Sequence, residues 1–145
     1  MKDKLYLIVA ALLCILSMNS CLVDTLEWDD SDMHGDQYKN ITFHNRCNES
    51  VYLGYATFGS SESEFTTKMM MSEGMVLIPK DGTYRNMCAA IDNKELVYQI
   101  MIIKSSTYDK YGKDDIVNKN IFDKKYTLSY DQLESKGFVI EYVNE

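Results

Sequence analysis

Hydrophobic and polar residues alternate with a period of two over several short segments of this chain. Ile41 and Phe43 alternate with Thr42 and His44, and residues 138–143 repeat the pattern. Alternation of this kind over about four to eight residues is typical of a strand with one buried face. Strands are also predicted for short segments that lie between turn residues, at 51–58, 75–78, 84–90 and 121–128.

The residues between these segments indicate how the strands connect. Residues 45–50 are a turn region, so the first two strands are predicted to pair as a hairpin. Pro79–Gly82 is a turn in which proline fixes φ and glycine permits positive φ. Residues 59–68 are polar and are predicted to form a loop. In contrast, 96–103 is the most apolar segment after residue 20 and is predicted to be a central strand covered on both faces.

Helical signals are confined to the C-terminal part. Ser129 and Gln132 have the spacing of a capping box, Gly137 can end the helix, and Leu133 is expected to face the core. Residues 108–118 are charged and are predicted to be a short helix or an excursion. The elements together predict a mostly β fold, a small antiparallel β-sandwich (Ig-like or transthyretin-like) with one or two short helices, in a single domain over residues 38–145.

The N-terminal segment has a different character. Lys2 and Lys4 precede an almost wholly apolar run from Leu5 to Leu16. That run is shorter than the roughly 20 apolar residues that a helix needs to span a bilayer. Small and polar residues follow it, which is typical of a secretory signal peptide, and the signal peptide is predicted to cover residues 1–20.

Residues Met18–Cys21 resemble a bacterial lipobox, in which a small residue precedes a cysteine that is acylated and becomes residue one after cleavage. Ser20 and Cys21 fit the pattern, and Met18 stands where leucine is commoner. The resemblance implies lipidation of Cys21 and anchoring to an outer membrane through acyl chains, on the periplasmic side or at the cell surface. An ordinary secretory signal with a cysteine nearby and an uncleaved anchor are the alternatives.

Charge limits the range of partners. Removal of the signal peptide takes away Lys2, Lys4 and Asp3, so the formal net charge of −7 becomes −8. This acidity argues against nucleic acid as a partner, because affinity for nucleic acid comes largely from lysine and arginine contacts with phosphates. Residues 21–37 are acidic and lack apolar periodicity, so they are predicted to be a flexible tether.

The C-terminal part carries a pattern that suggests a family: Tyr126-Thr127-Leu128-Ser129, then Leu133, Gly137-Phe138, Ile140 and Tyr142. With the preceding apolar strand and charged segment, this pattern resembles small uncharacterised lipoproteins of Bacteroides-type bacteria. Residues 41–58 resemble the opening of the same proteins, a strand, an Asn-rich turn and an aromatic strand. The chain departs at Val143, where family members often have proline. The resemblance implies a fold and a cellular address, and it carries over no catalytic residue.

Two cysteines remain in the predicted mature chain besides Cys21, at Cys47 and Cys88. Export places them in an oxidising compartment, where a pair of cysteines favours a disulfide over a metal or redox site. A Cys47–Cys88 disulfide is therefore predicted, and it would stabilise the fold by about 4 kcal/mol in the chain-entropy model. Two buried free thiols are the alternative.

Residues suited to catalysis are scarce. His34 and His44 lack the spacing relative to Cys47 and Cys88 that a zinc site or a catalytic triad needs. Carboxylates are abundant, but none stands within an apolar run, where its pKa would be raised. No catalytic residue, no cofactor and no metal ligand is predicted, and the chain is expected not to be an enzyme.

Aromatic residues offer a different kind of site. Five of them can form a platform for a sugar or a peptide: Tyr52, Tyr55, Phe58, Tyr108 and Tyr111. Core packing is the alternative for these residues, as it is for Met69–Met71, which can also form a soft metal or partner site. The sequence thus predicts a non-enzymatic, membrane-anchored envelope lipoprotein that binds a glycan, a peptide or an envelope protein. A structural accessory subunit of an uptake or adhesion complex is the alternative, followed by a small hydrolase.

Overall fold

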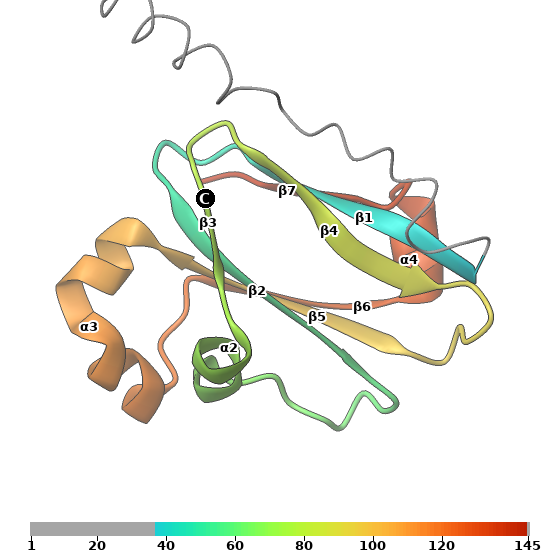
Figure 1. The fold of residues 1–145 in the computed structure, drawn as a ribbon, viewed down its shortest axis with the longest axis horizontal. Coiled ribbons are helices and arrows are strands. Elements are labelled where there is room, and N and C mark those ends of the chain that lie inside the picture. Colours follow the sequence, from blue (N-terminus) through green and yellow to red (C-terminus); the bar gives the residue numbers. More distant parts are fainter. Residues whose placement is uncertain (1–36, 145) are drawn as a thin grey trace, which may run out of the picture. The chain divides into compact units, whose positions relative to one another are not determined.

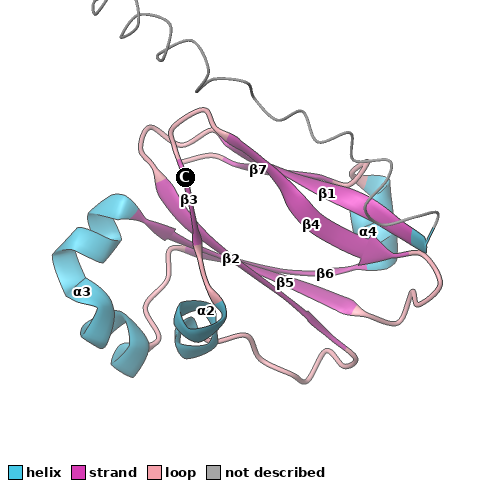
Figure 2. Cartoon of the chain, viewed as in Figure 1, coloured by secondary structure: helices cyan, strands magenta, loops and turns pink. Residues whose placement is uncertain are grey.

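The computed structural model describes residues 37–144, so the predicted signal peptide, the predicted lipidation site at Cys21 and nearly all of the predicted tether lie outside the described residues. All described elements belong to one compact unit, Met33–Glu145 (Figures 1 and 2). Their order is β1 (Tyr38–Asn45), β2 (Val51–Phe58), α2 (Thr67–Glu73), β3 (Val76–Ile78), β4 (Thr83–Ala90), β5 (Val97–Lys104), α3 (Ser105–Lys119), β6 (Lys124–Ser129), α4 (Tyr130–Ser135) and β7 (Val139–Tyr142).

The strands form two layers, which Figure 1 shows one above the other. One sheet has the strand order β4-β1-β7 and the other has the order β3-β2-β5-β6. Neighbouring strands pair antiparallel, except β1 and β7, which are parallel. The prediction of a mostly β fold with two packed sheets is confirmed, and the Ig-like or transthyretin-like arrangement stays a prediction. The described residues contain three helices, where one or two were expected.

The layer between the two sheets is the first apolar core, which we call the inter-sheet core. Alternation along β1 places Ile41 and Phe43 in it with no exposed surface, and β7 contributes Ile140. Leu133 of α4 also lies in this core, as its place in the predicted helix indicates. Each large apolar side chain buried here stabilises the fold by about 1.5–3 kcal/mol.

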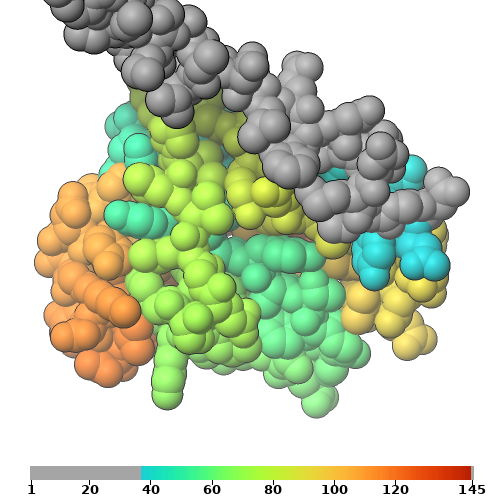
Figure 3. Space-filling model, viewed as in Figure 1, coloured from blue at the N-terminus to red at the C-terminus, as the bar shows by residue number. Residues whose placement is uncertain are grey.

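Strand β5 is buried on both faces, as its apolar sequence predicts. Ile100 and Ile102 face the inter-sheet core, whereas Met101 and Ile103 face the opposite side of the sheet with Ile116 of α3, and all five are fully buried. Helices α2 and α3 cover this opposite side (Figure 1). In Figure 3, α3 (orange) lies against the green segment that holds α2. We call the apolar layer under these helices the outer core.

The predicted hairpin between the first two strands is wrong. β1 pairs with β4 and β7, whereas β2 pairs with β3 and β5, so the two strands belong to different sheets. Asn45, which is buried, supports the crossing between sheets. Its Nδ2 donates to the carbonyl oxygens of Glu49 at 2.9 Å and Pro79 at 3.0 Å, and its Oδ1 accepts from the Cys47 N–H at 3.0 Å. These bonds satisfy backbone groups that a crossing would otherwise leave unpaired.

Helix α4 begins as the sequence predicts. The Gln132 N–H donates to Ser129 Oγ at 3.2 Å, and the Ser129 N–H donates to Gln132 Oε1 at 2.9 Å, which completes the capping box. Gly137 follows the helix with a φ of 62°. α3 is longer than the predicted segment and holds Gly112 at a φ of 70°, where two helical pieces meet. α2 begins at the end of the segment that was predicted to be a loop.

Candidate functional site

The aromatic residues predicted as a binding platform do not share one surface. Alternation along β2 places Tyr52 and Phe58 on the outer-core face and Tyr55 on the inter-sheet face. The Tyr52 ring centre lies 4.8 Å from that of Tyr108, and the Phe58 ring centre lies 6.5 Å from that of Phe65. These rings pack against one another and against the sheet, which was the alternative interpretation.

Tyr55 and Tyr111 lie in different environments, one partly buried and one exposed. The Tyr55 hydroxyl donates to the Cys88 carbonyl oxygen at 2.6 Å and accepts from Thr57 Oγ1 at 3.0 Å. Burial raises the pKa of Tyr55 to about 12. Tyr111 on α3 is 38% exposed, and Lys110 Nζ lies 4.8 Å from its ring centre. A single aromatic platform is therefore wrong for this fold, because strand alternation splits its members between two faces.

The predicted disulfide between Cys47 and Cys88 is also wrong, since both residues are free thiols. Cys88 of β4 pairs with Asn40, whereas Cys47 lies beyond Asn45, the last residue of β1. The strand from Asn40 to Asn45 spans about 17 Å at about 3.3 Å per residue. A disulfide needs Cα atoms within about 7 Å. Cys47 is buried instead, and its Sγ donates to Asn144 Oδ1 at 2.7 Å.

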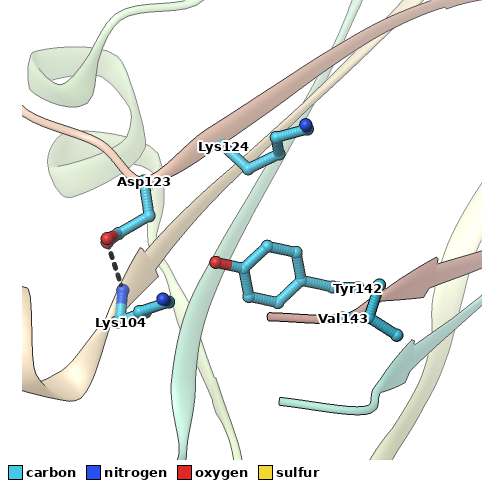
Figure 4. Close-up of a pocket in the computed structure, with 5 residues that line it drawn as sticks. All are labelled: Lys104, Asp123, Lys124, Tyr142 and Val143. Carbon is cyan, nitrogen blue, oxygen red and sulfur yellow. Dashed lines mark hydrogen bonds between the residues drawn. The ribbon is translucent and has the colours of Figure 1, made fainter. Parts of the chain in front are cut away.

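A hollow of about 170 Å³ opens beside the edge strands β6 and β7. Its walls come from Lys104 at the end of β5, from Asp123 and Lys124 at the start of β6, and from Tyr142 and Val143 at the end of β7 (Figure 4). β6 and β7 are edge strands of different sheets, and α4 connects them. The hollow is therefore an open end of the layer between the sheets.

Strand alternation explains why polar side chains reach this place. On β5, Lys104 follows the inward residue Ile102 by two positions. On β6, Lys124 precedes the inward residue Leu128 by four positions, and on β7 Tyr142 is the last inward residue. Because side chains two residues apart share a face of a strand, the apolar layer ends here in two ammonium groups and a phenol.

Asp123 fixes the end of β5. Its Oδ2 accepts from the Lys104 backbone N–H at 2.7 Å, a bond drawn in Figure 4, and its Oδ1 accepts from the Thr107 hydroxyl at 2.9 Å. Both oxygens are thus engaged near the start of α3, where the helix dipole favours negative charge. The Lys104 ammonium forms no ion pair with any residue of the described range 37–144.

Tyr142 combines burial with an unpaired hydroxyl. Its side chain is only 5% exposed, and the hydroxyl forms no hydrogen bond with the residues that the structure describes. Within those residues, every enclosed side-chain nitrogen or oxygen has a partner, so this hydroxyl must open onto the hollow. Figure 4 shows it pointing toward Lys104 and Asp123. Burial, and then the charge of Asp123, raise the pKa of Tyr142, so its phenol is a protonated donor at neutral pH.

The described residues that line the hollow can bind a ligand through charge and hydrogen bonds. Within residues 37–144, one carboxylate lines it, whereas glycoside hydrolysis commonly uses two. Across residues 37–144, no group of three or more His, Cys, Asp or Glu side chains could hold a metal ion. His44 Nδ1 lies 2.9 Å from Thr83 Oγ1. Met70 is fully buried in the outer core, so packing is the role of this part of Met69–Met71.

Sequence reasoning missed the hollow although its signal is present in the sequence. Lys104 and Lys124 occupy inward positions of strands whose other inward residues are apolar. A lysine in that register is a local exception to the binary pattern, and such exceptions tend to occur at functional sites. What the sequence does not provide is the pairing that brings the end of β5, the start of β6 and the end of β7 together.

No family model, no curated protein and no solved structure matches this chain. None of the helices in the described part of the chain has the length and apolar character needed to cross a bilayer. The function is therefore argued from the geometry of the hollow and from the sequence.

Proposed function

We propose that this chain is a non-enzymatic, lipid-anchored binding protein of a bacterial cell envelope, held at the outer membrane by acyl chains on Cys21. Its β-domain binds a group of a glycan, a peptide or an envelope protein at the hollow beside β6 and β7. The observation that carries the binding role is the Tyr142 hydroxyl, which belongs to a buried side chain, opens onto the hollow and has no partner among the described residues. A phenol in this position can donate a hydrogen bond to an acceptor atom of a ligand.

The size of the hollow supports recognition of one chemical group. Pockets that enclose whole small molecules have volumes of about 300–1,000 Å³, whereas this hollow measures about 170 Å³. A ligand would place one polar group in the hollow and leave the rest of the molecule outside, along the edges of β6 and β7. This mode suits a long or bulky ligand such as a glycan or a peptide.

The proposed address rests on residues Met18–Cys21, which resemble a lipobox. It is tested by labelling cells with radioactive palmitate in a bacterium that processes lipoproteins. The wild-type chain and a Cys14→Ala control should both be labelled, because Cys14 follows a bulky leucine and fits the motif poorly. Cys21→Ala should carry no label. Equal labelling of wild type and Cys21→Ala would contradict lipid anchoring.

The proposed binding role is tested by thermal unfolding with a panel of oligosaccharides and peptides. A ligand at about 100 times its Kd stabilises the folded state by about 2.7 kcal/mol, which raises Tm by several degrees. Tyr142→Phe removes the hydroxyl and keeps the ring, so its Tm should rise less than that of the wild type. A ligand that raises both Tm values equally would bind elsewhere and contradict the assignment of the hollow.

A further inference from the structure

We propose that Met69, Met71 and Met75 form a modification site, at which a peroxide oxidises their thioethers to sulfoxides and thereby detaches α2 from the sheet. Met69 and Met71 belong to α2, and Met75 lies between α2 and β3. We call these three residues the thioether site. It lies on the outer core and is independent of the hollow and of the proposed binding function.

The described methionines fall into two groups by their access to solvent. Three are half-buried, and these are Met69, Met71 and Met75. The other three are at most 1% exposed, and these are Met70, Met87 and Met101. An oxidant in solution reaches a fully buried side chain only after the structure opens locally. The thioether site should therefore be oxidised first.

The consecutive methionines of α2 place one thioether under the helix and one on each flank. Met70 faces the sheet, because a Cβ added at Gly54 on β2 would lie 2.9 Å from its Sδ. Successive side chains of a helix are about 100° apart, so Met69 and Met71 lie on the two flanks. Both pack against the outer core, as does Met75. Each member of the thioether site thus contacts the apolar layer while part of it remains accessible.

The modification is a two-electron oxidation of sulfur. A lone pair of the sulfur attacks one oxygen of hydrogen peroxide, the O–O bond breaks, and the second oxygen leaves as water after taking up the proton of the first. The thioether is apolar, whereas the sulfoxide that forms is polar. A polar oxygen held against an apolar layer without a partner is unfavourable. Oxidation therefore favours states in which these side chains, and α2 with them, leave the outer core.

Few other contacts hold α2 in place. The helix has seven residues, which is too short for stability without tertiary packing. Thr67 Oγ1 donates to the Ile116 carbonyl oxygen at 2.9 Å, and the Thr67 N–H donates to Asn120 Oδ1 at 2.9 Å. Both bonds involve the first residue of α2, so packing holds the part that carries the methionines. Once that part has left the sheet, Met70 is accessible and is oxidised in a second step.

The experiment is a time course of the full chain in detergent micelles with hydrogen peroxide at neutral pH. Peptide mass spectrometry locates each added oxygen atom and separates the described methionines from Met33, which lies outside the described residues. We expect the thioether site to react at least about tenfold faster than Met87 and Met101. Met70 should follow the thioether site. The Tm of the same samples should fall by about 5–10 °C as the thioether site is oxidised.

Two variants connect the fall in Tm to the thioether site. The triple variant Met69→Leu, Met71→Leu and Met75→Leu nearly conserves volume, so it should fold as the wild type does. It retains the free thiols, so any effect of thiol oxidation persists in it. Its Tm should fall much less in peroxide than that of the wild type. Met87→Leu is the matched control, since it removes a buried methionine of the inter-sheet core, and its Tm should fall as much as that of the wild type.

Three results would overturn the proposal. These are oxidation of the thioether site no faster than that of Met87 and Met101, complete oxidation of the thioether site without a fall in Tm, and equal falls in Tm for the wild type and the triple variant. The first two are measured on the wild type alone, so they test the proposal even if the triple variant does not fold.

Discussion

The inter-sheet core and the outer core share strand β5 but are closed in different ways. Over the inter-sheet core lies a hydrogen-bonded sheet, in which the ladder fixes the position of Phe43 and its neighbours. The outer core is covered by α2, α3 and the segment before α2. Two methionines are fully buried in this core, Met70 of α2 and Met101 of β5. Methionine is flexible and fills irregular gaps. The same strand thus has a rigid cover on one face and a more adaptable cover on the other.

Polar contacts hold the cover of the outer core in place. Gln99, which is 2% exposed, accepts from the Phe65 N–H at 2.8 Å and donates to the Ser63 carbonyl oxygen at 2.6 Å. Thr67 Oγ1 donates to the Ile116 carbonyl oxygen at 2.9 Å and so joins α2 to α3. The helices are therefore attached at a few specific points, whereas a ladder attaches the strands at every second residue.

The largest effect should come from matched truncations of the two cores. Phe43 and Phe65 are both at most 1% exposed, one in the inter-sheet core and one in the outer core. Phe43→Ala should destabilise the fold by about 3–5 kcal/mol. Phe65→Ala should cost less, because the segment before α2 can collapse into the space while the ladder around Phe43 cannot. Urea unfolding measures both, and an equal or larger loss for Phe65→Ala would contradict the comparison.

A smaller effect is expected where α2 approaches the sheet most closely. A Cβ added at Gly54 on β2 would lie 2.9 Å from Met70 Sδ, which requires Met70 to move. Gly54→Ala should therefore cost about 1–3 kcal/mol. In the double variant with Met70→Ala, the space is free, so the combined loss in urea unfolding should be smaller than the sum of the single losses. Additive losses would show that the contact is not what makes glycine necessary.

The burial of the Tyr55 hydroxyl on the inter-sheet face can be tested by measuring stability as a function of pH. Burial raises the pKa of Tyr55 from 10.0 to about 12 in the folded state. Its contribution to stability is therefore fully present below pH 10 and is lost as pH rises from 10 to 12. Tyr55→Phe should be less stable than wild type by about 1 kcal/mol at pH 8, because its hydrogen bonds are lost.

By pH 11 the wild type should have lost about 1.4 kcal/mol through Tyr55, and the gap to Tyr55→Phe should close. Urea unfolding of both proteins at pH 8, 10 and 11 measures the gap directly. Cys88 and Tyr98, whose pKa values burial also raises, are present in both proteins. A gap that stays constant to pH 11 would contradict the burial of the Tyr55 hydroxyl.

The smallest effect compares the caps of two short helices. Ser129 caps α4 within a reciprocal capping box, whereas Thr66 Oγ1 caps α2 by accepting one hydrogen bond, from the Met69 N–H. Ser129→Ala should cost about 1 kcal/mol and Thr66→Ala about 0.5 kcal/mol. Thermal unfolding measures the two losses. A larger loss at Thr66 would mean that the cover of the outer core depends on α2 more than its contacts indicate.

The sequence predicts elements better than it predicts their partners. The alternation around Ile41 and Phe43, the alternation at 138–143, the strand covered on both faces at 96–103 and the capping box at Ser129 all follow from local patterns. The structure contains them as β1, β7, β5 and the start of α4. The prediction of a hairpin was wrong because a turn region between two strands does not show whether both strands belong to the same sheet. Here the chain passes from one sheet to the other, and the Asn45 side chain forms hydrogen bonds with backbone groups of the connecting segment.

The turn after β3 shows a finer limit of local patterns. The residue with positive φ is Asp81, at 59°, whereas glycine was expected to supply it at Gly82. Gly82 is needed for space, because its Cβ would lie 2.8 Å from the Pro79 carbonyl oxygen. The sequence correctly predicts a turn at this place, but the division of roles between the two residues depends on the path of the backbone.

Predicting the candidate site requires knowledge of which strands pair, even more than predicting the fold does. The Cys47–Cys88 prediction used the chemistry of the compartment, which favours disulfides but cannot bring two distant points of a strand pair together. The lysines of the hollow were visible as exceptions in their strands. Only the register of β5 with β6, and the placement of β7, show that Lys104, Lys124 and Tyr142 meet.

The parallel pairing of β1 with β7 joins the first and the last strands of the described domain. The sheet β4-β1-β7 is therefore incomplete until the C-terminal strand has been synthesised and, in an exported chain, has crossed the inner membrane. Long-range pairing of this kind slows folding, which would leave time for translocation if the chain is exported as proposed. Since β7 supplies Tyr142, the proposed binding site is complete only when β7 has joined the sheet.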